Sequence, residues 1–295
     1  MTNLLRRIFV SGLAAAAVLA GSPAIAAAQA EVPLADLLRA THVHGLVVDR
    51  GDPMRLLIAT HHGLHAAALG SGQARRVSET TDDLMGFTPH PTDATVLYAS
   101  GHPAGGGNLG FVASADGGKS WTSLSPGVGG PVDFHQMDVS KADPDVIYGV
   151  HGGLQVSRDG GRSWEQVGPA PEGLVDLAAS AQAAGRLYAA TQQGLLFSAD
   201  GGASWTPGHA AGRPVSLVEV TADGTVFAFV IGSGLLRADE GSLGWETVSG
   251  SFADRYLLHL AIDADEPGRL FALTQNGELL ASRDGGRSWS VLAQP

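Results

Sequence analysis

The chain has 295 residues and a formal charge of −11, so it is long enough to bury a large core and too acidic to favour a nucleic acid or an anionic membrane as its partner. Charged residues make up only 16% of it, and its 41 glycines fit many short strands joined by tight turns. It has no cysteine, which excludes disulfides, thiolate metal sites and a cysteine nucleophile.

Residues 1–30 have the pattern of a cleaved signal peptide. Arg6 and Arg7 precede the apolar stretch 8–20, and small residues follow as far as Ala30. The apolar stretch is too short for a good membrane span, so we expect no span after cleavage. The arginine pair leaves both a Sec and a twin-arginine signal open. We expect a monomer exported to the periplasm or the medium, with a lead-in over 31–41 and one domain over 42–295.

One octapeptide recurs along the rest of the chain. SRDGGRSW occurs at 157–164 and 282–289, with near copies at 114–121 and 198–205 and an expanded copy at 237–245. A period of about 40 residues is typical of propellers and solenoids. Each copy joins the third and fourth of four short apolar strands, which is the plan of a propeller blade. Inner strands that begin near residues 42, 83, 132, 174, 214 and 256 predict an all-β, six-bladed β-propeller of four-stranded antiparallel blades, entered on an inner strand.

The residue types of the octapeptide indicate a structural hairpin. Its Asp can accept hydrogen bonds from the backbone of its own turn, its glycines supply positive φ, and its Trp can bury a large apolar surface. We therefore predict a structural role for these residues: Asp116, Trp121, Asp159, Trp164, Asp200, Trp205, Asp239, Trp245, Asp284 and Trp289. The octapeptide resembles the Asp box of BNR-repeat proteins, and the chain is similar to the bacterial glycosylhydrolase-like members of that group, which implies the sialidase-superfamily fold.

Histidine departs most from the repeat, because nine of the eleven lie between His42 and His151, in blades 1–3. Matching the inner strands places His44 level with Met85 and His135. Innermost strands line the channel and alternate residues point the same way, so these side chains are expected to converge. The predicted metal ligands are His44, Met85, His135 and Met137.

A second set of histidines lies at the turns between the second and third strands of blades 1–3. These turns are at the same end of the propeller as the starts of the inner strands, so both sets are expected at one channel mouth. The predicted ligand-binding residues there are His42, His61, His62, His102 and His151. By contrast, we expect His65 at the surface. Imidazole and thioether ligands favour copper, and imidazole with carboxylate also suits zinc.

Two other interpretations stay open. The resemblance implies glycoside hydrolysis, although the inner strands have almost no arginine for the carboxylate-binding triad that a sialidase requires. Another glycosidase needs two carboxylates roughly 5–10 Å apart, for which Asp83, Asp133 and Asp138 are the catalytic candidates; Glu219 is expected on the wrong side of the ring. The remaining interpretation is a protein-interaction propeller, which should show a broad apolar or charged face. The ligand is thus a metal, a glycan or another small molecule.

Overall fold

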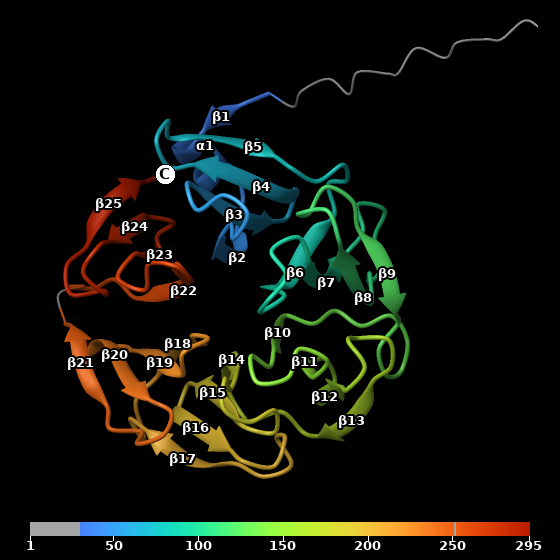
Figure 1. The fold of residues 1–295 in the computed structure, drawn as a ribbon, viewed down its shortest axis with the longest axis vertical. Helices are drawn as coiled ribbons and strands as arrows, with labels where there is room; N and C mark the ends of the chain where they lie inside the picture. Colours follow the sequence, from blue (N-terminus) through green and yellow to red (C-terminus); the bar gives the residue numbers. More distant parts are fainter. Residues whose placement is uncertain (1–29, 251) are drawn as a thin grey trace, which may run out of the picture.

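The computed structural model describes residues 30–250 and 252–295, whose strands form six sheets arranged as a ring around a central channel (Figure 1). The prediction of a six-bladed β-propeller is confirmed. The expected signal peptide, residues 1–30, lies outside the described residues except for Ala30. No helix in the described ranges is long and apolar enough to cross a membrane.

Each blade is a meander whose strands run from the channel to the rim in chain order. The inner strands are β2 (Val43–Val48), β6 (Asp83–Pro89), β10 (Gln136–Val139), β14 (Leu174–Ala179), β18 (Val215–Val220) and β22 (Leu257–Ile262). The second strands are β3 (Arg55–Thr60), β7 (Leu97–His102), β11 (Ile147–Val150), β15 (Leu187–Thr191), β19 (Thr225–Val230) and β23 (Leu270–Thr274).

The two outer layers complete the blades. The third strands are β4 (Gly63–Ala68), β8 (Phe111–Ser114), β12 (Leu154–Ser157), β16 (Gly194–Ser198), β20 (Gly234–Asp239) and β24 (Leu279–Ser282). The outermost strands are β5 (Gln73–Arg76), β9 (Thr122–Ser125), β13 (Glu165–Gly168), β17 (Thr206–His209), β21 (Glu246–Ser249) and β25 (Ser290–Ala293).

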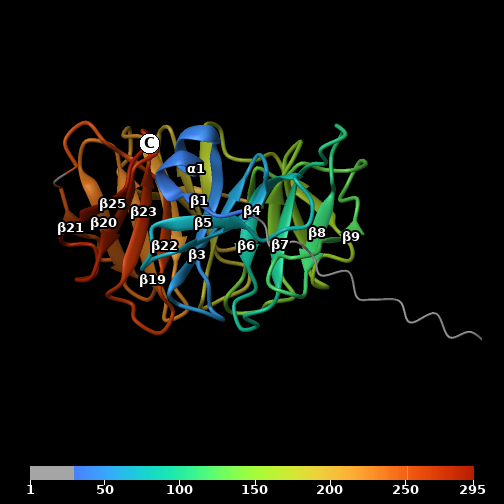
Figure 2. The ribbon, with the colours of Figure 1, turned by 90° about the horizontal axis from the view of Figure 1, so that it is seen from above.

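The ring closes differently from the sequence-based expectation, because the described chain does not enter on an inner strand. It begins with β1 (Val32–Pro33), which pairs with β5 as a fifth strand outside blade 1. Helix α1 (Leu34–Ala40) follows and buries three leucines in a core cluster that also contains Phe271 and Leu279 of blade 6. Figure 2 shows α1 beside the C-terminus, so the lead-in covers the junction between the first and last blades.

The octapeptides form turns with the expected side-chain contacts. In the last copy, Asp284 Oδ1 accepts from the Ser288 backbone N–H at 2.9 Å, and Asp284 Oδ2 accepts from the Ser288 hydroxyl at 2.6 Å. These hydrogen bonds hold the pKa of Asp284 down at about 2. Trp164 of an earlier copy packs on Phe111 and Phe134, with ring centroids 5.2 and 4.7 Å away, and so fills the space between blades 2 and 3.

A bulge near the start of the inner strand recurs in most blades. His44, Val175, Ser216 and Leu258 each lie between two paired residues of their strand, without a partner of their own on the second strand. These residues all line the channel, together with His135, which directly precedes β10. The bulge therefore places one side chain per blade at the same level of the channel wall.

Candidate functional site

Two clusters of histidine and aspartate lie at the channel mouth, where the inner strands begin. Site 1 consists of His44 at the bulge of β2, His61 in the β3–β4 turn and Asp83 at the start of β6. His61 Nδ1 lies 2.7 Å from Asp83 Oδ2 and 3.1 Å from His44 Nε2, and His44 Nε2 lies 3.3 Å from Asp83 Oδ1. One nitrogen or oxygen of each residue is within 4.8 Å of the others, so a single ion could contact all three.

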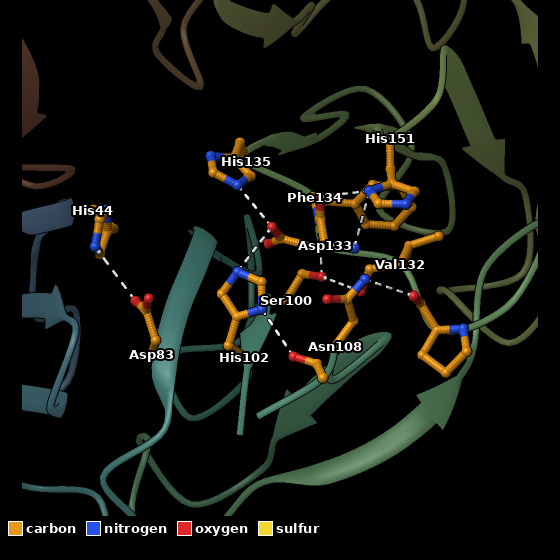
Figure 3. Close-up of polar contacts among 12 residues, drawn as sticks. His44, Asp83, Ser100, His102, Asn108, Val132, Asp133, Phe134, His135 and His151 are labelled. Carbon is orange, nitrogen blue, oxygen red and sulfur yellow. Dashed lines mark hydrogen bonds and ion pairs between the residues drawn. The ribbon is translucent and has the colours of Figure 1, made fainter. Parts of the chain in front are cut away.

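Site 2 consists of His102, the last residue of β7, with Asp133 and His135 from the segment before β10. Figure 3 shows His102 and His135 approaching Asp133 from two sides. Their Nε2 atoms lie 3.1 and 2.7 Å from Asp133 Oδ2. In this set too, one nitrogen or oxygen of each residue lies within 4.8 Å of the others, so a single ion could contact all three.

The two sites are related by the propeller repeat. In each, a histidine at or just after the end of the second strand of one blade meets an aspartate at or just before the inner strand of the next blade. These pairs are His61 with Asp83, and His102 with Asp133. Asp83 is also the direct cross-strand partner of His102 in the β6–β7 pair, so the sites are neighbours. At the corresponding position of blade 4 the chain has Gly173, which supplies no third aspartate.

Both aspartates leave one buried oxygen without a hydrogen bond. Within the described ranges neither Asp83 Oδ1 nor Asp133 Oδ1 accepts a hydrogen bond, although His44 Nε2 lies 3.3 Å from Asp83 Oδ1. A buried carboxylate oxygen in this state costs free energy unless a water or a cation satisfies it. The same unsatisfied oxygen therefore recurs at equivalent positions of two blades, where a cation or a water could contact it.

The surroundings shift the pKa values of His44 and His102 in opposite directions. Burial lowers the pKa of His44 to about 4, so its imidazole is neutral at pH 7 and free to act as a ligand. In site 2, His102 Nδ1 donates to the Gly107 carbonyl at 2.8 Å, which raises the pKa of His102. That hydrogen bond directs Nε2 at Asp133, as is usual for metal-binding histidines. When Nδ1 donates, Nε2 of the neutral His102 ring presents a lone pair to the Asp133 carboxylate. This contact requires either a proton or a cation between the two atoms.

Other predicted site residues lie outside these clusters. His42 and His62 are exposed, and the ring of His42 lies 5.4 Å from that of His61. His151 Nδ1 contacts the backbone of Asp133, 3.3 Å from its nitrogen and 3.1 Å from its oxygen, and so positions Asp133 rather than joining site 2.

The structure separates the residues that were expected to form one His–Met–His set, because His44 and His135 belong to different sites. In blade 2 the bulge lies between Met85 and Thr88, so Met85 pairs in register with Ser100. Met85 is 9% exposed and is not among the channel-lining residues. Met137 lines the channel but is only 7% exposed and packs in the core between blades 2 and 3. The position of a bulge within a strand is not visible in the repeat.

A further charged cluster lies deeper in the channel. Asp138 accepts from Lys141 Nζ at 2.5 Å, from the Ala179 backbone N–H at 2.8 Å and from Thr88 Oγ1 at 3.2 Å. Lys141 Nζ is also 3.7 Å from Glu219 Oε1. The expectation that Glu219 lies on the wrong side of the ring is therefore wrong, because Lys141 connects it to Asp138 across the channel.

Burial perturbs the acids of this cluster. It raises the pKa of Glu219 to about 7 and that of Asp176, on β14, to about 8. The channel has a volume of about 660 Å³, which is enough for a small molecule. The sequence pattern could not reveal this cluster, because its members come from three blades and no motif connects them.

Comparisons with known proteins agree with the architecture. No protein-family model matches the chain. A xyloglucanase from a Paenibacillus species is 33% identical over 121 residues, which cover 34% of this chain but only 12% of that enzyme. The GH74 enzyme of Niastella koreensis superposes with a TM-score of 0.61 at 15% identity, over 85% of this chain and 45% of that one. YCF48 from Cyanidioschyzon merolae superposes with a TM-score of 0.52 at 17% identity, over 90% and 88% of the two chains.

These similarities show the fold. The chain is a six-bladed propeller with glycoside hydrolases of the GH74 type and YCF48 among its structural neighbours. It spans less than half the length of the GH74 structure and about an eighth of the xyloglucanase.

Proposed function

We propose that the protein binds two transition-metal ions, zinc or copper(II), at sites 1 and 2. The proposal is supported by an arrangement that occurs twice. Each site has two imidazole nitrogens and one aspartate, and one buried oxygen of that aspartate lacks a hydrogen bond. As part of the same proposal, residues 1–30 direct export, and the ions are bound in the periplasm or the medium.

The ligand atoms favour zinc and copper(II) over copper(I), calcium and magnesium. Imidazole with carboxylate suits zinc and copper(II), whereas the softer copper(I) prefers sulfur ligands. Met85 is buried away from the channel, so the sites have borderline rather than soft character. Calcium and magnesium prefer sets made of oxygen atoms, which neither site supplies.

The test is the metal content of the untagged mature protein, measured by mass spectrometry after dialysis against zinc or copper(II). We expect two ions per chain in the wild type and one in each of His61→Ala and His102→Ala, which remove equivalent ligands from the two sites. His62→Ala is the matched control, because this exposed ring belongs to neither cluster. A wild type that binds no metal would refute the proposal, as would ligand variants that retain both ions.

A second candidate function is glycoside hydrolysis in the channel. The similarity to a xyloglucanase favours it, and so does the geometry around Lys141. Lys141 Nζ is 2.5 Å from Asp138 Oδ2 and 3.7 Å from Glu219 Oε1, so these oxygens are at most about 6 Å apart. This upper bound admits the separation of about 5–5.5 Å found in retaining glycosidases and is too short for inverting ones. Glu219, with its pKa raised to about 7, would be the acid, and the hydrogen-bonded Asp138 would be the second carboxylate. Of the earlier candidates, Asp83 and Asp133 are better explained as metal ligands.

This second function is tested with xyloglucan and cello-oligosaccharides as substrates. Loss of a general acid typically slows a reaction by about 10²–10⁴-fold, which is the expected effect of Glu219→Gln. Asp223→Asn is the control, since this exposed acid also lines the channel but lies outside the Lys141 cluster. The absence of hydrolysis by the wild type, or full activity of Glu219→Gln, would exclude this function.

A further inference from the structure

The two proposed metal sites differ in how open they are. In site 1 the side chains of His44 and Asp83 are each 16% exposed, and only that of His61 is more open, at 38%. His42 lies over His61 with its ring centroid 5.4 Å away. In site 2 the side chains of His102 and His135 are 40% and 54% exposed, while Asp133 is 9% exposed. An ion in site 2 would therefore have protein ligands on one side and the channel mouth on the other.

We infer that site 2 is an exchangeable centre, whose metal takes the carboxylate of a small organic ligand with an aliphatic body. The inference rests on the proposed function and deepens it. Three protein ligands with a free fourth position are the arrangement in which zinc accepts water or a substrate. A divalent ion bound by two neutral imidazoles and one carboxylate retains one positive charge, so an anionic oxygen donor is the complementary ligand.

The channel wall indicates the rest of the ligand. Val175, Ser216 and Leu258 occupy the bulge positions of blades 4–6, at the level of His135. Leu258 is 36% exposed, and the Ser216 hydroxyl donates to the Leu257 carbonyl at 2.7 Å. At this level, blades 4–6 therefore present two aliphatic side chains and one hydroxyl, whereas blades 1 and 3 present His44 and His135. Figure 1 shows β14, which carries Val175, next to β10.

Charge fixes the orientation of such a ligand. Deeper in the channel, Lys141 contacts Asp138 and Glu219, so its positive charge is already paired with acidic side chains. A ligand carboxylate is therefore held less strongly by the paired Lys141 than by the metal at the mouth. Its aliphatic body then lies against Val175 on β14, the neighbour of β10, where burial of methylene groups is favourable.

The experiment uses the mature chain loaded with cobalt(II), whose visible absorption changes when an anion enters its coordination sphere. His61→Ala retains site 2 alone, and His102→Ala and His135→Ala each retain site 1 alone. We expect acetate to shift the cobalt spectrum of the wild type and of His61→Ala, and to leave His102→Ala and His135→Ala unchanged.

Chain length tests the aliphatic part. Each fully buried methylene tightens binding about fourfold, so hexanoate should bind to His61→Ala at least about tenfold more tightly than acetate. Val175→Asn, added to His61→Ala, should reduce this preference to less than about threefold without weakening acetate. Ile231→Asn is the control, because Ile231 is 37% exposed but does not line the channel.

The outcomes separate this inference from the proposed function. If no variant gives a cobalt spectrum, metal binding itself fails. If the spectra are present but acetate shifts none of them, or shifts only those of His102→Ala and His135→Ala, metal binding stands and the exchangeable site 2 is refuted. If acetate and hexanoate bind equally well, the aliphatic part of the ligand is refuted.

Discussion

Replacing His65 should reduce the sensitivity of the fold to acid. His65 lies on β4 and is 8% exposed, so its expected surface position is wrong: both faces of a blade pack against neighbouring structure. Its Nδ1 is 3.4 Å from Thr60 Oγ1, and burial lowers its pKa from 6.5 to about 4. The imidazole of His65 therefore binds its proton more tightly in the unfolded chain than in the folded one. The folded state consequently loses stability as the pH falls from about 6.5 towards 4.

The size of the effect follows from the pKa change. One pKa unit corresponds to about 1.4 kcal/mol, so the change from 6.5 to about 4 costs about 3 kcal/mol of unfolding free energy at low pH. At pH 5, where the folded protein has bound little of this proton, the cost is about 2 kcal/mol relative to pH 8. This pH-dependent loss of unfolding free energy should be absent from His65→Leu.

Urea unfolding at pH 8 and pH 5, with a chelator present, measures the difference. The unfolding free energy of His65→Leu should fall by about 2 kcal/mol less than that of the wild type between these pH values, with an unchanged urea dependence. His62→Leu is the control, because that ring is exposed on the adjacent turn. If His65→Leu and the wild type lose the same free energy, burial does not suppress protonation of His65 and the reasoning is wrong.

Three further predictions concern the scaffold and site 2. Trp164→Ala should lower the unfolding free energy by about 3–5 kcal/mol in urea titrations, because its ring fills the space between blades 2 and 3. Gly161→Ala should destabilise far more than Gly117→Ala by the same assay, although both have positive φ: a Cβ at Gly161 would lie 2.0 Å from Phe111, whereas one at Gly117 meets nothing within 4 Å. Deleting residues 105–106 should weaken zinc binding at site 2 about 10–100-fold and leave site 1 unchanged in calorimetric titrations, because the shortened loop displaces the Gly107 carbonyl that orients His102.

The fold could be predicted from the sequence because its determinants are local and repeated. Each octapeptide closes its own turn, as the contacts between Asp284 and Ser288 show, and the short apolar strands around it repeat with one period. The lead-in was not predictable in the same way. Helix α1 is stable at its place because its leucines reach Phe271 and Leu279, more than 200 residues further along the chain.

The sequence by itself determined which residues are unusual: an excess of histidine in blades 1–3, with Asp83 and Asp133 at the starts of inner strands. Only the tertiary structure decided how they combine. His61 meets Asp83, and His102 meets Asp133, across blade boundaries, while the shifted bulge of blade 2 buries Met85. A displacement of one residue in a strand turns a side chain to the opposite face, and contacts between blades depend on how the whole ring packs. Neither the position of a bulge nor the contacts between blades are encoded in the local pattern that repeats.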